Sequence, residues 1–429
     1  MTMTDHECDV MVIGGGMAGT AAAIAAARGG ARTVLIESAS ALGGMGTCGL
    51  VPALAPYNYN DPHGPPWIRG LAWEFVERLD RADALLGLGP NQWWKLFDKE
   101  KAKLVLDRMA LEAGVRVRFF TTFFEAQVRS RRVESILTAS KAGPERWKAK
   151  IVIDATGDAD LCAAAGAAVE VAETPMPPTY CFTVGNIDRA RLGDPKRVNE
   201  ALVRGKREGR LRNPEDHRGE KDIFGPDVMV FNYNHVYDVD CLDPDDLTRA
   251  TIEGRETAYE LLDYLKDTVP GFERARIVNL ASLLGVRETR RIVGDFRLTG
   301  RAYFESHRHE DDVCVYDYAI DLHASRPTAE EREEYYELYY NRRTRPGEVY
   351  GIPFRSLRPA DLDNVLAAGR CISCDRQMLA SLRVMPTCLA TGEAAGAAAA
   401  IATTENEALR DVSSARLQDA LRSNGAYIP

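Results

Sequence analysis

Three glycines near the N-terminus have the spacing of a dinucleotide-binding turn. Gly14, Gly16 and Gly19 form a GxGxxG pattern between an apolar run and a helix of small residues. Such glycines let the chain turn tightly, let a pyrophosphate approach bare backbone and let the helix pack on the sheet, with the phosphates at the helix N-terminus. Glu37 follows a second apolar run, where an acid accepts hydrogen bonds from a ribose. Residues 9–37 therefore predict a complete βαβ unit that binds a dinucleotide.

Two histidines are candidates for proton transfer, because imidazole titrates near neutral pH. His323, in the segment AIDLH, is the stronger candidate for a base that accepts a substrate proton. His235, in FNYNHVYD, is its rival, although Tyr233 and Asn234 could make it a packed, hydrogen-bonded residue. A structural role remains the alternative for both.

Arginines are concentrated in the segment RETRRIVGD. Arg287, Arg290 and Arg291 lie close to Glu288, and at helical spacing some of them would form ordinary surface pairs. Arginine also binds carboxylates and oxyanions in a bidentate way. Arg287 and Arg383 are therefore kept as candidate site residues.

Cys371 and Cys374 form a CxxC motif that could act as a redox dithiol. No second CxxC accompanies it to complete a zinc site, so we expect unpaired thiols and no metal. The total of nine cysteines, an odd number, is typical of free thiols in a reducing cytoplasm.

The elements that must position these residues follow an α/β pattern. A loop containing Gly43, Gly44 and Gly46 suits close backbone contact with a bound ring system. Residues 70–79 predict a surface helix with an apolar stripe, and a second helix follows at 98–113.

Further along, the apolar period changes to two. Alternation at 115–119 and short strands at 125–128 and 135–139 predict an antiparallel meander that crosses the parallel sheet. Residues 150–158 predict a buried strand that ends in a turn, where ligands of open α/β sheets gather. Another alternating run, Val313 to Asp321, predicts a strand before His323.

The C-terminal segment has the same pattern as the N-terminal one, a strand followed by a helix of small residues. A strand at 364–368 ends in Gly369-Arg370, and a small-residue helix begins near Pro386, in which Gly392 and Gly396 permit a close helix contact. We therefore predict a discontinuous dinucleotide domain, residues 1–175 and 350–429, and a substrate or capping domain, residues 176–349.

Composition limits the classes of function. The chain has 429 residues, 45% hydrophobic and 27% charged, and a net charge of −9, which argues against nucleic acid or an acidic membrane as a partner. No apolar run reaches the roughly 18 residues of a membrane span. We expect a cytoplasmic protein that acts on a small molecule, with its oligomeric state left open.

Several stretches together resemble the FAD-dependent oxidoreductase family built on the glutathione-reductase-type flavin fold. The matching stretches are GGGMAG, LGGMGTCGLV, FDKEKAKLVLDRMALEAGV, DATGDADL, RETRRIVGD, AIDLH, AGRCIS and RVMPTCLATGEAAG. The resemblance implies non-covalent FAD, a Rossmann-like FAD-binding domain with a parallel sheet, and a second, α+β domain over the flavin ring. Cys374 is a departure, because similar sequences more usually have a small residue without a thiol there. Cys48 could attach FAD covalently, although a packing role is the simpler interpretation.

The resemblance also implies which residues contact FAD. The start of the C-terminal helix would hold the pyrimidine edge of the flavin, where free backbone N–H groups stabilise negative charge near N1. The expected contacts are Gly14, Gly16, Met17, Ala18, Gly19, Glu37, Ser38, Gly43, Gly44, Met45, Gly46, Thr47, Ala155, Thr156, Gly157, Asp158, Gly369, Arg370, Arg383, Met385, Pro386 and Thr387.

The expected function is oxidation of a small hydroxylated or amine-bearing molecule by hydride transfer to flavin N5, with oxygen or an electron carrier as the acceptor. His323, His235, Arg287 and Arg383 are the candidate catalytic residues. A flavin monooxygenase is a competing interpretation, against which no second GxGxxG motif is present. An electron-transfer subunit, supported only by the CxxC motif, and a flavin-binding scaffold without turnover also stay open.

Overall fold

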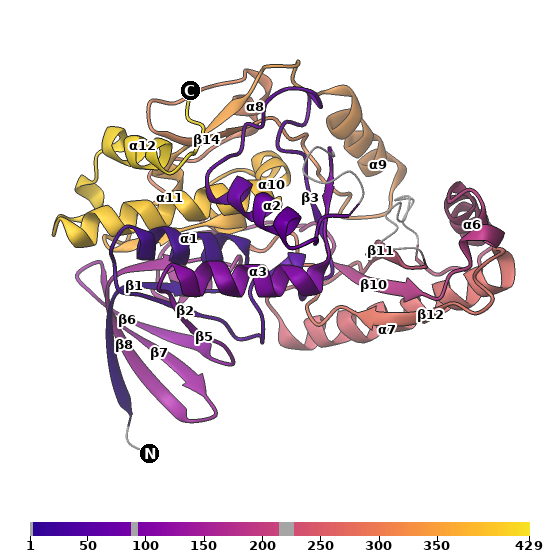
Figure 1. Cartoon of the computed structure of the whole chain (residues 1–429), viewed down its shortest axis with the longest axis horizontal. Coiled ribbons are helices and arrows are strands. Elements are labelled where there is room, and N and C mark those ends of the chain that lie inside the picture. Colours follow the sequence, from indigo (N-terminus) through magenta and orange to yellow (C-terminus); the bar gives the residue numbers. More distant parts are fainter. Residues whose placement is uncertain (1–2, 87–92, 214–226) are drawn as a thin grey trace.

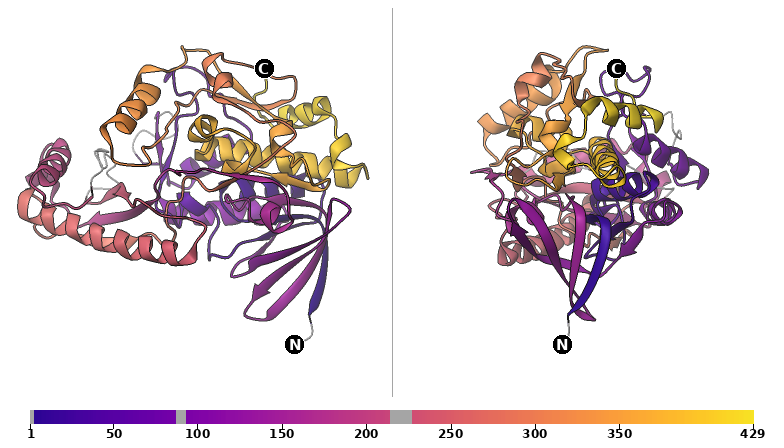
Figure 2. Two further views of the ribbon diagram at one scale, coloured as in Figure 1. Left: turned by 180° about the vertical axis from the view of Figure 1, so that it is seen from behind. Right: turned by 90° about the vertical axis from the view of Figure 1, so that its left-hand side faces the viewer.

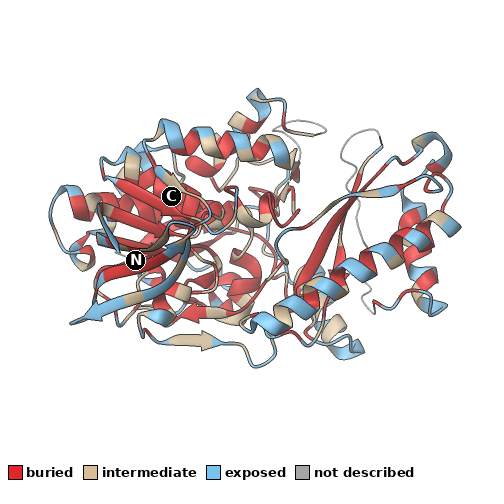
Figure 3. Cartoon of the chain, turned by 90° about the horizontal axis from the view of Figure 1, so that it is seen from below, coloured by how far each residue is buried: buried red, intermediate tan, exposed pale blue. Residues whose placement is uncertain are grey.

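A computed structural model describes residues 3–86, 93–213 and 227–429 of the chain. A larger body carries both termini, and a smaller body built from residues between 179 and 280 extends from one side of it (Figures 1 and 2). Buried residues gather in the centre of the larger body and, separately, in the smaller one (Figure 3).

The central sheet of the larger body has the strand order β5-β2-β1-β8-β7-β6, with β16 also paired to β8. Its strands are β1 (Thr4–Ile13), β2 (Thr33–Ile36), β5 (Arg116–Arg118), β6 (Thr122–Arg129), β7 (Arg132–Ser140), β8 (Gly143–Asp154) and β16 (Val365–Ala367). β1, β2, β5, β8 and β16 are parallel, whereas β6, β7 and the first part of β8 are antiparallel. This arrangement confirms the predicted α/β fold with a parallel sheet and an antiparallel meander.

β8 joins the two parts of the sheet. Its residues 143–147 pair with β7, and its residues 152–154 pair with β16, while β1 runs parallel to it on the other side. The assignment of 115–119 to the meander is wrong, because β5 pairs in parallel with β2 at the sheet edge. The exposed arginine at 116 produces the alternation there, so a period of two alone does not distinguish an edge strand from a meander strand.

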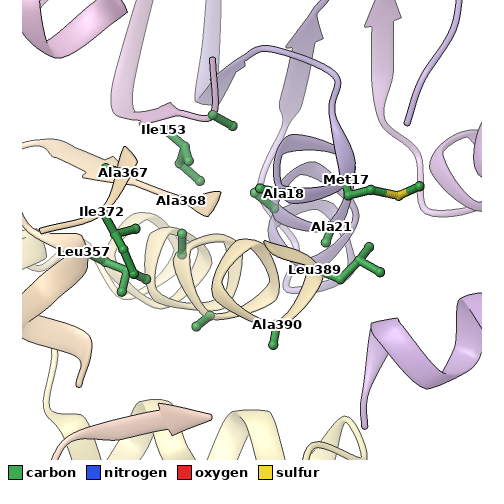
Figure 4. Packing of buried hydrophobic residues seen from close by; sticks show 14 of the residues in the cluster. Met17, Ala18, Ala21, Ile153, Leu357, Ala367, Ala368, Ile372, Leu389 and Ala390 are labelled. Atoms are coloured by element: carbon green, nitrogen blue, oxygen red, sulfur yellow. The ribbon is translucent and has the colours of Figure 1, made fainter. Parts of the chain in front are cut away.

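Two helices of small residues cover this sheet close to each other (Figure 4). They are α1 (Met17–Arg28) and α11 (Met385–Thr404). A Cβ atom on Gly392 would lie 2.1 Å from the carbonyl oxygen of Ala18, and one on Gly396 would lie 2.1 Å from that of Ala22. The predicted close contact is therefore confirmed, and it requires glycine at both positions.

The larger body contains further helices. The predicted surface helix is α2 (Leu71–Arg81), and the second is α3 (Lys99–Glu112), whose N-cap Asp98 accepts from the backbone N–H groups of Glu100 and Lys101. The others are α4 (Asp160–Ala164), α8 (Gly300–Phe304), α9 (Ala329–Tyr336), α10 (Arg376–Leu382) and α12 (Ser414–Ser423). Short helical turns lie at Gly44–Gly46, Glu337–Asn341, Phe354–Leu357, Gly369–Cys371 and Leu409–Asp411, and short strands are β3 (Ala53–Leu54), β4 (Lys95–Leu96), β9 (Val169–Val171), β13 (Arg290–Ile292), β14 (Asp312–Tyr316) and β15 (Tyr350–Pro353).

The smaller body has its own hydrophobic core. A three-stranded sheet, β10 (Thr179–Gly185), β11 (Met229–His235) and β12 (Arg276–Leu280), packs against α6 (Lys196–Arg207) and α7 (Pro244–Thr268), and α5 (Arg189–Leu192) lies beside them. From Ile292 to Tyr350, by contrast, buried side chains join the core of the larger body. The division into a FAD-binding domain and a capping domain over 176–349 stays a prediction.

Two local predictions are wrong. The strand expected at Val313 to Asp321 ends at Tyr316, because the Asp317 carboxylate accepts the backbone N–H groups of Tyr59 and Asn60, both at 2.8 Å. The ordinary surface pairs expected for the arginine segment are not formed: Arg291 does pair with Glu288 at 2.9 Å, but both side chains are buried, and Arg290 and Arg291 lie in strand β13.

Among the described residues, no single helix is long and apolar enough to cross a membrane; α10 and α11 meet that test only as a pair with a 95° bend between them.

Candidate active site

The glycine turn between β1 and α1 has the shape that a dinucleotide requires. Gly14 has φ +97°, and a Cβ atom there would lie 2.6 Å from the carbonyl oxygen of Ala155. A Cβ on Gly19 would lie 1.8 Å from the oxygen of Gly14, whereas one on Gly16 would meet nothing within 4 Å. Two glycines thus allow close packing, and the third leaves open space at the N-terminus of α1.

Glu37 lies at the end of β2, next to this turn. Its Oε2 accepts the backbone N–H of Gly15 at 2.6 Å, and its Oε1 accepts the N–H of Ala39 at 2.7 Å and the hydroxyl of Ser38 at 3.2 Å. The carboxylate is therefore fixed beside the glycine turn, as the ribose-binding role requires.

The loop of residues 43–47 packs against the same turn. The N–H of Gly43 donates to the oxygen of Gly15 at 2.8 Å, and the Thr47 hydroxyl donates to Leu42 O at 2.6 Å. A Cβ on Gly44 would lie 3.1 Å from Cα of Gly16. The backbone of this loop is therefore in direct contact with the backbone of the glycine turn.

Residues from α1, the 43–47 loop and α11 meet at one point. A Cβ on Gly46 would lie 2.5 Å from Cε of Met17 and 2.9 Å from Sδ of Met385. A Cβ on Gly369 would lie 3.0 Å from Cβ of Ala18. Segments far apart in the sequence are thus brought together as expected for one cofactor site.

The end of β8 contributes an ion pair. Asp158 binds the guanidinium of Arg370 at 2.6 Å and accepts from the Thr289 hydroxyl at 2.5 Å. Thr156 donates to the buried Asp154 at 2.8 Å, and Gly157 has φ +82° with its Cα facing Arg370. The predicted residues of this turn therefore lie together, with Arg370 tied to Asp158.

Unpartnered polar atoms test whether these segments fit FAD. Among the described residues, the buried Oγ1 of Thr387, Nε of Arg370 and Nε of Arg383 have no hydrogen-bond partner. All three belong to segments that the sequence assigns to the cofactor, and Pro386 and Thr387 lie in the first turn of α11. The open space at Gly16 and the donors of Thr387 and Arg370 fit a nucleotide with anionic and carbonyl groups.

The four candidate catalytic residues come together at a second point. The imidazole rings of His323 and His235 have centroids 5.0 Å apart, and His235 ends β11. Arg287 and Arg383 both act on His323 electrostatically. Arg383 precedes α11, so this cluster adjoins the segment expected to hold the flavin.

Asp321 is the residue of this cluster that sequence reasoning missed. Its Oδ1 lies 3.3 Å from Nε2 of His323, and its Oδ2 and carbonyl oxygen accept from Arg383 at 3.0 and 2.9 Å. The signal was present, since Asp321 stands two residues before His323 in AIDLH. Tyr335 was also missed; its ring centroid lies 5.6 Å from that of His323.

Burial and the two arginines set the charges in the cluster. Burial and the Arg287 guanidinium lower the pKa of His323 to about 3, although Asp321 acts in the opposite direction. Burial and Arg287 also lower the pKa of His235 well below its ordinary value. Burial alone would raise the pKa of Asp321, but His323, Arg383 and Arg287 bring it below its usual range. At neutral pH both imidazoles are therefore neutral and Asp321 is ionised.

The CxxC cysteines lie away from solvent. Cys371 and Cys374 are both buried free thiols, and burial raises the pKa of Cys374 to about 12 and that of Cys371 well above its ordinary value. Such thiols hold little thiolate at neutral pH, which disfavours exchange chemistry. Cys48 is buried as well.

The parallel sheet, the glycine turn and the acid after β2 define a Rossmann-type dinucleotide-binding protein. The family model described as FAD dependent oxidoreductase matches residues 9–421, so the chain belongs to that family. FAD is accordingly its cofactor.

Individual relatives are distant. The soluble pyridine nucleotide transhydrogenase of Marinomonas sp. (strain MWYL1) is 31% identical over 161 residues, which are 36% of this chain and 32% of the relative. The chain thus matches about a third of that relative's length. GidA of Aquifex aeolicus is similar over 94% of this chain and 64% of its own, with a TM-score of 0.51 and 13% identity. A geranylgeranyl bacteriochlorophyll reductase-like protein from Thermoplasma acidophilum covers 98% of this chain and 83% of its own, with a TM-score of 0.48 and 14% identity. The likeness to GidA indicates a shared fold.

Proposed function

We propose that this protein oxidises a small organic molecule that carries a hydroxyl or amine group, with His323 as the base. The observation that carries this proposal is the buried imidazole of His323, whose Nε2 lies 3.3 Å from Oδ1 of Asp321, while Arg383, two residues before α11, binds the same carboxylate. When bound, FAD supplies a two-electron acceptor that takes a hydride at N5.

The orientation of His323 follows from Asp321. An ionised carboxylate 3.3 Å from Nε2 favours a proton on that nitrogen, which leaves the lone pair of the neutral ring on Nδ1. The neutral imidazole of His323 is then the group that accepts the proton of the substrate hydroxyl or amine. Asp321 stabilises the imidazolium that forms, and Arg383 fixes Asp321 in place.

Residues around the glycine turn would hold the cofactor. Glu37 would accept the hydroxyls of the adenosine ribose, and the N-terminus of α1 would face the pyrophosphate. The first turn of α11 would donate to the flavin pyrimidine, with the Thr387 hydroxyl available as a further donor. Oxygen or a diffusible carrier would accept the electrons afterwards.

Anaerobic titration of the purified holoprotein tests this function. A panel of alcohols, polyols, amines and hydroxy acids is mixed with the protein, and loss of flavin absorbance is recorded. We expect at least one class to reduce the flavin without any nicotinamide nucleotide. Reduction by NADH or NADPH alone, with every panel member inert, would contradict the proposal and favour a reductase or monooxygenase.

A further inference from the structure

The cluster around His323 contains a buried arginine whose charge is not balanced. Arg287 is 9% exposed and donates to the carbonyl oxygen of Pro177 at 2.6 Å and to the hydroxyl of Thr179 at 2.5 Å. Both acceptors are uncharged. Within the described part of the chain, Arg287 forms no hydrogen bond with a carboxylate.

The carboxylate of Asp321, which belongs to this cluster, already has two partners. Asp321 binds Arg383 through Oδ2 at 3.0 Å and faces His323 through Oδ1 at 3.3 Å. Nε of Arg383 is buried and has no acceptor among the described residues. Among the residues that the structure describes, two guanidinium groups therefore share one carboxylate beside two neutral imidazoles, which gives this described cluster a surplus positive charge.

A surplus buried charge is unfavourable unless an anion joins it. Burial and the like charge of Arg383 lower the pKa of Arg287 to about 10, although Asp321 acts in the opposite direction. Arginine binds carboxylates through a planar set of N–H donors, and Arg287 has used only Nη1 in the contacts above. Its other donors and Nε of Arg383 can bind one carboxylate group.

The position of Arg287 connects it with the cofactor loop. Gly285, two residues earlier, would with a Cβ atom lie 3.6 Å from Cε of Met45, in the loop expected to contact the flavin. Aromatic rings also lie close to His323. The ring of Tyr335 is 5.6 Å from His323 and is stacked on Tyr339 at 5.5 Å. These rings suit a flat, apolar group of a ligand.

We propose that the substrate is a 2-hydroxy or 2-amino acid with an aromatic side chain, whose carboxylate binds Arg287 and Nε of Arg383. This inference rests on the proposed function. The C2–H bond breaks and its hydrogen leaves with two electrons to FAD, while the hydroxyl or neutral amine proton passes to His323. A C=O or C=N bond forms, so the product is a 2-oxo or 2-imino acid, and oxygen or a carrier reoxidises the reduced FAD.

Anion binding would also make His323 a better base. Arg287 is, after burial, the strongest influence that lowers the pKa of His323. A carboxylate beside Arg287 offsets that positive charge and raises the proton affinity of the imidazole. The acid group would thus contribute to proton transfer as well as to binding.

The test uses the holoprotein and a carboxylate that cannot be oxidised at C2. Phenylacetate is titrated against the flavin absorbance spectrum, with the neutral phenylacetamide as its matched ligand. We expect a saturable spectral change with phenylacetate. Phenylacetamide should bind at least about tenfold more weakly than phenylacetate. Arg287→Gln should weaken phenylacetate binding by about tenfold to a hundredfold, the scale of a lost charged hydrogen bond. Arg204→Gln, at an exposed position of α6, should leave it unchanged.

Equal binding of acid and amide by the wild-type protein would overturn the anion site, and this comparison needs no variant to fold. Unchanged phenylacetate binding by a folded Arg287→Gln or Arg287→Lys variant would overturn the assignment to Arg287. If phenylacetate binds as expected but no alcohol, polyol, amine, hydroxy acid or amino acid reduces the flavin, the carboxylate site stands and the proposed oxidation fails. If only uncharged alcohols or amines reduce the flavin, the oxidation stands and the acid substrate is overturned.

Discussion

Replacement of Glu393 by glutamine should remove a large pH dependence of stability. Glu393 lies in α11 and is 2% exposed; its Oε2 accepts the N–H of Leu71 at 2.9 Å, and its Oε1 has no partner among the described residues. Burial raises the pKa of this carboxyl from 4.5 to about 8, although the Leu71 N–H and Arg28 act in the opposite direction. The folded protein therefore keeps a proton that the unfolded chain releases.

The sign and size of the effect follow from this difference. The protonated carboxyl contributes its full stability below pH 4.5, and that contribution is lost as the pH rises through the folded pKa of about 8. At about 1.4 kcal/mol per pKa unit, the free energy of unfolding should fall by about 3 kcal/mol between pH 5 and pH 8. The amide of Glu393→Gln can accept the same N–H and does not titrate, so this part of the pH dependence should disappear.

Urea unfolding followed by tryptophan fluorescence at pH 5 and pH 8, with FAD in excess, measures the effect. Glu333→Gln, at an exposed position of α9, is the matched control and should keep the wild-type pH dependence. The Glu393→Gln variant should be the more stable protein at pH 8. Parallel pH dependences for wild type and Glu393→Gln would refute the reasoning, because Glu393 would then be ionised in the folded protein.

Three further predictions concern the cofactor domain. Glu37→Ala should weaken FAD binding by about tenfold to a hundredfold in a titration of the apoprotein, because a charged acceptor is lost; unchanged affinity would mean that Glu37 does not contact the ribose. Gly392→Val should lower the free energy of unfolding by about 1 to 3 kcal/mol, because its Cβ would lie 2.1 Å from the oxygen of Ala18; a wild-type melting temperature would show that α1 and α11 separate freely. Acid precipitation should release yellow FAD into the supernatant, and colour that stays in the pellet would indicate covalent attachment, with Cys48 as the residue to examine.

Much of the cofactor site could be predicted because its signals are local. The spacing of Gly14, Gly16 and Gly19 encodes a turn whose constraints involve near neighbours, and the acid after β2 follows at a regular distance. The small residues of α11 predicted its close contact because only glycine at 392 and 396 permits two helices to approach so closely. Such features depend on backbone geometry, which short stretches of sequence specify.

The substrate side was less predictable because it depends on long-range contacts. Arg287 lies beside Thr179 and close to the two histidines only because β10, β11 and the segment after β14 meet, and no local pattern encodes that meeting. The strand before His323 ended early because Asp317 binds a backbone segment more than 250 residues away. Asp321 could have been found, since a carboxylate two residues from a candidate base is a local signal.

Anaerobic stopped-flow reduction of His323→Ala measures whether His323 accepts the substrate proton as the flavin is reduced. The variant should keep its fold and its FAD but reduce flavin about a hundredfold more slowly, the usual scale for a general base, with a smaller defect at high pH. His63→Ala, at an exposed position, should react like the wild type. An unchanged rate in His323→Ala would show that His323 is not the base and would leave His235 as the candidate. Loss of FAD or of the fold would assign His323 a structural role.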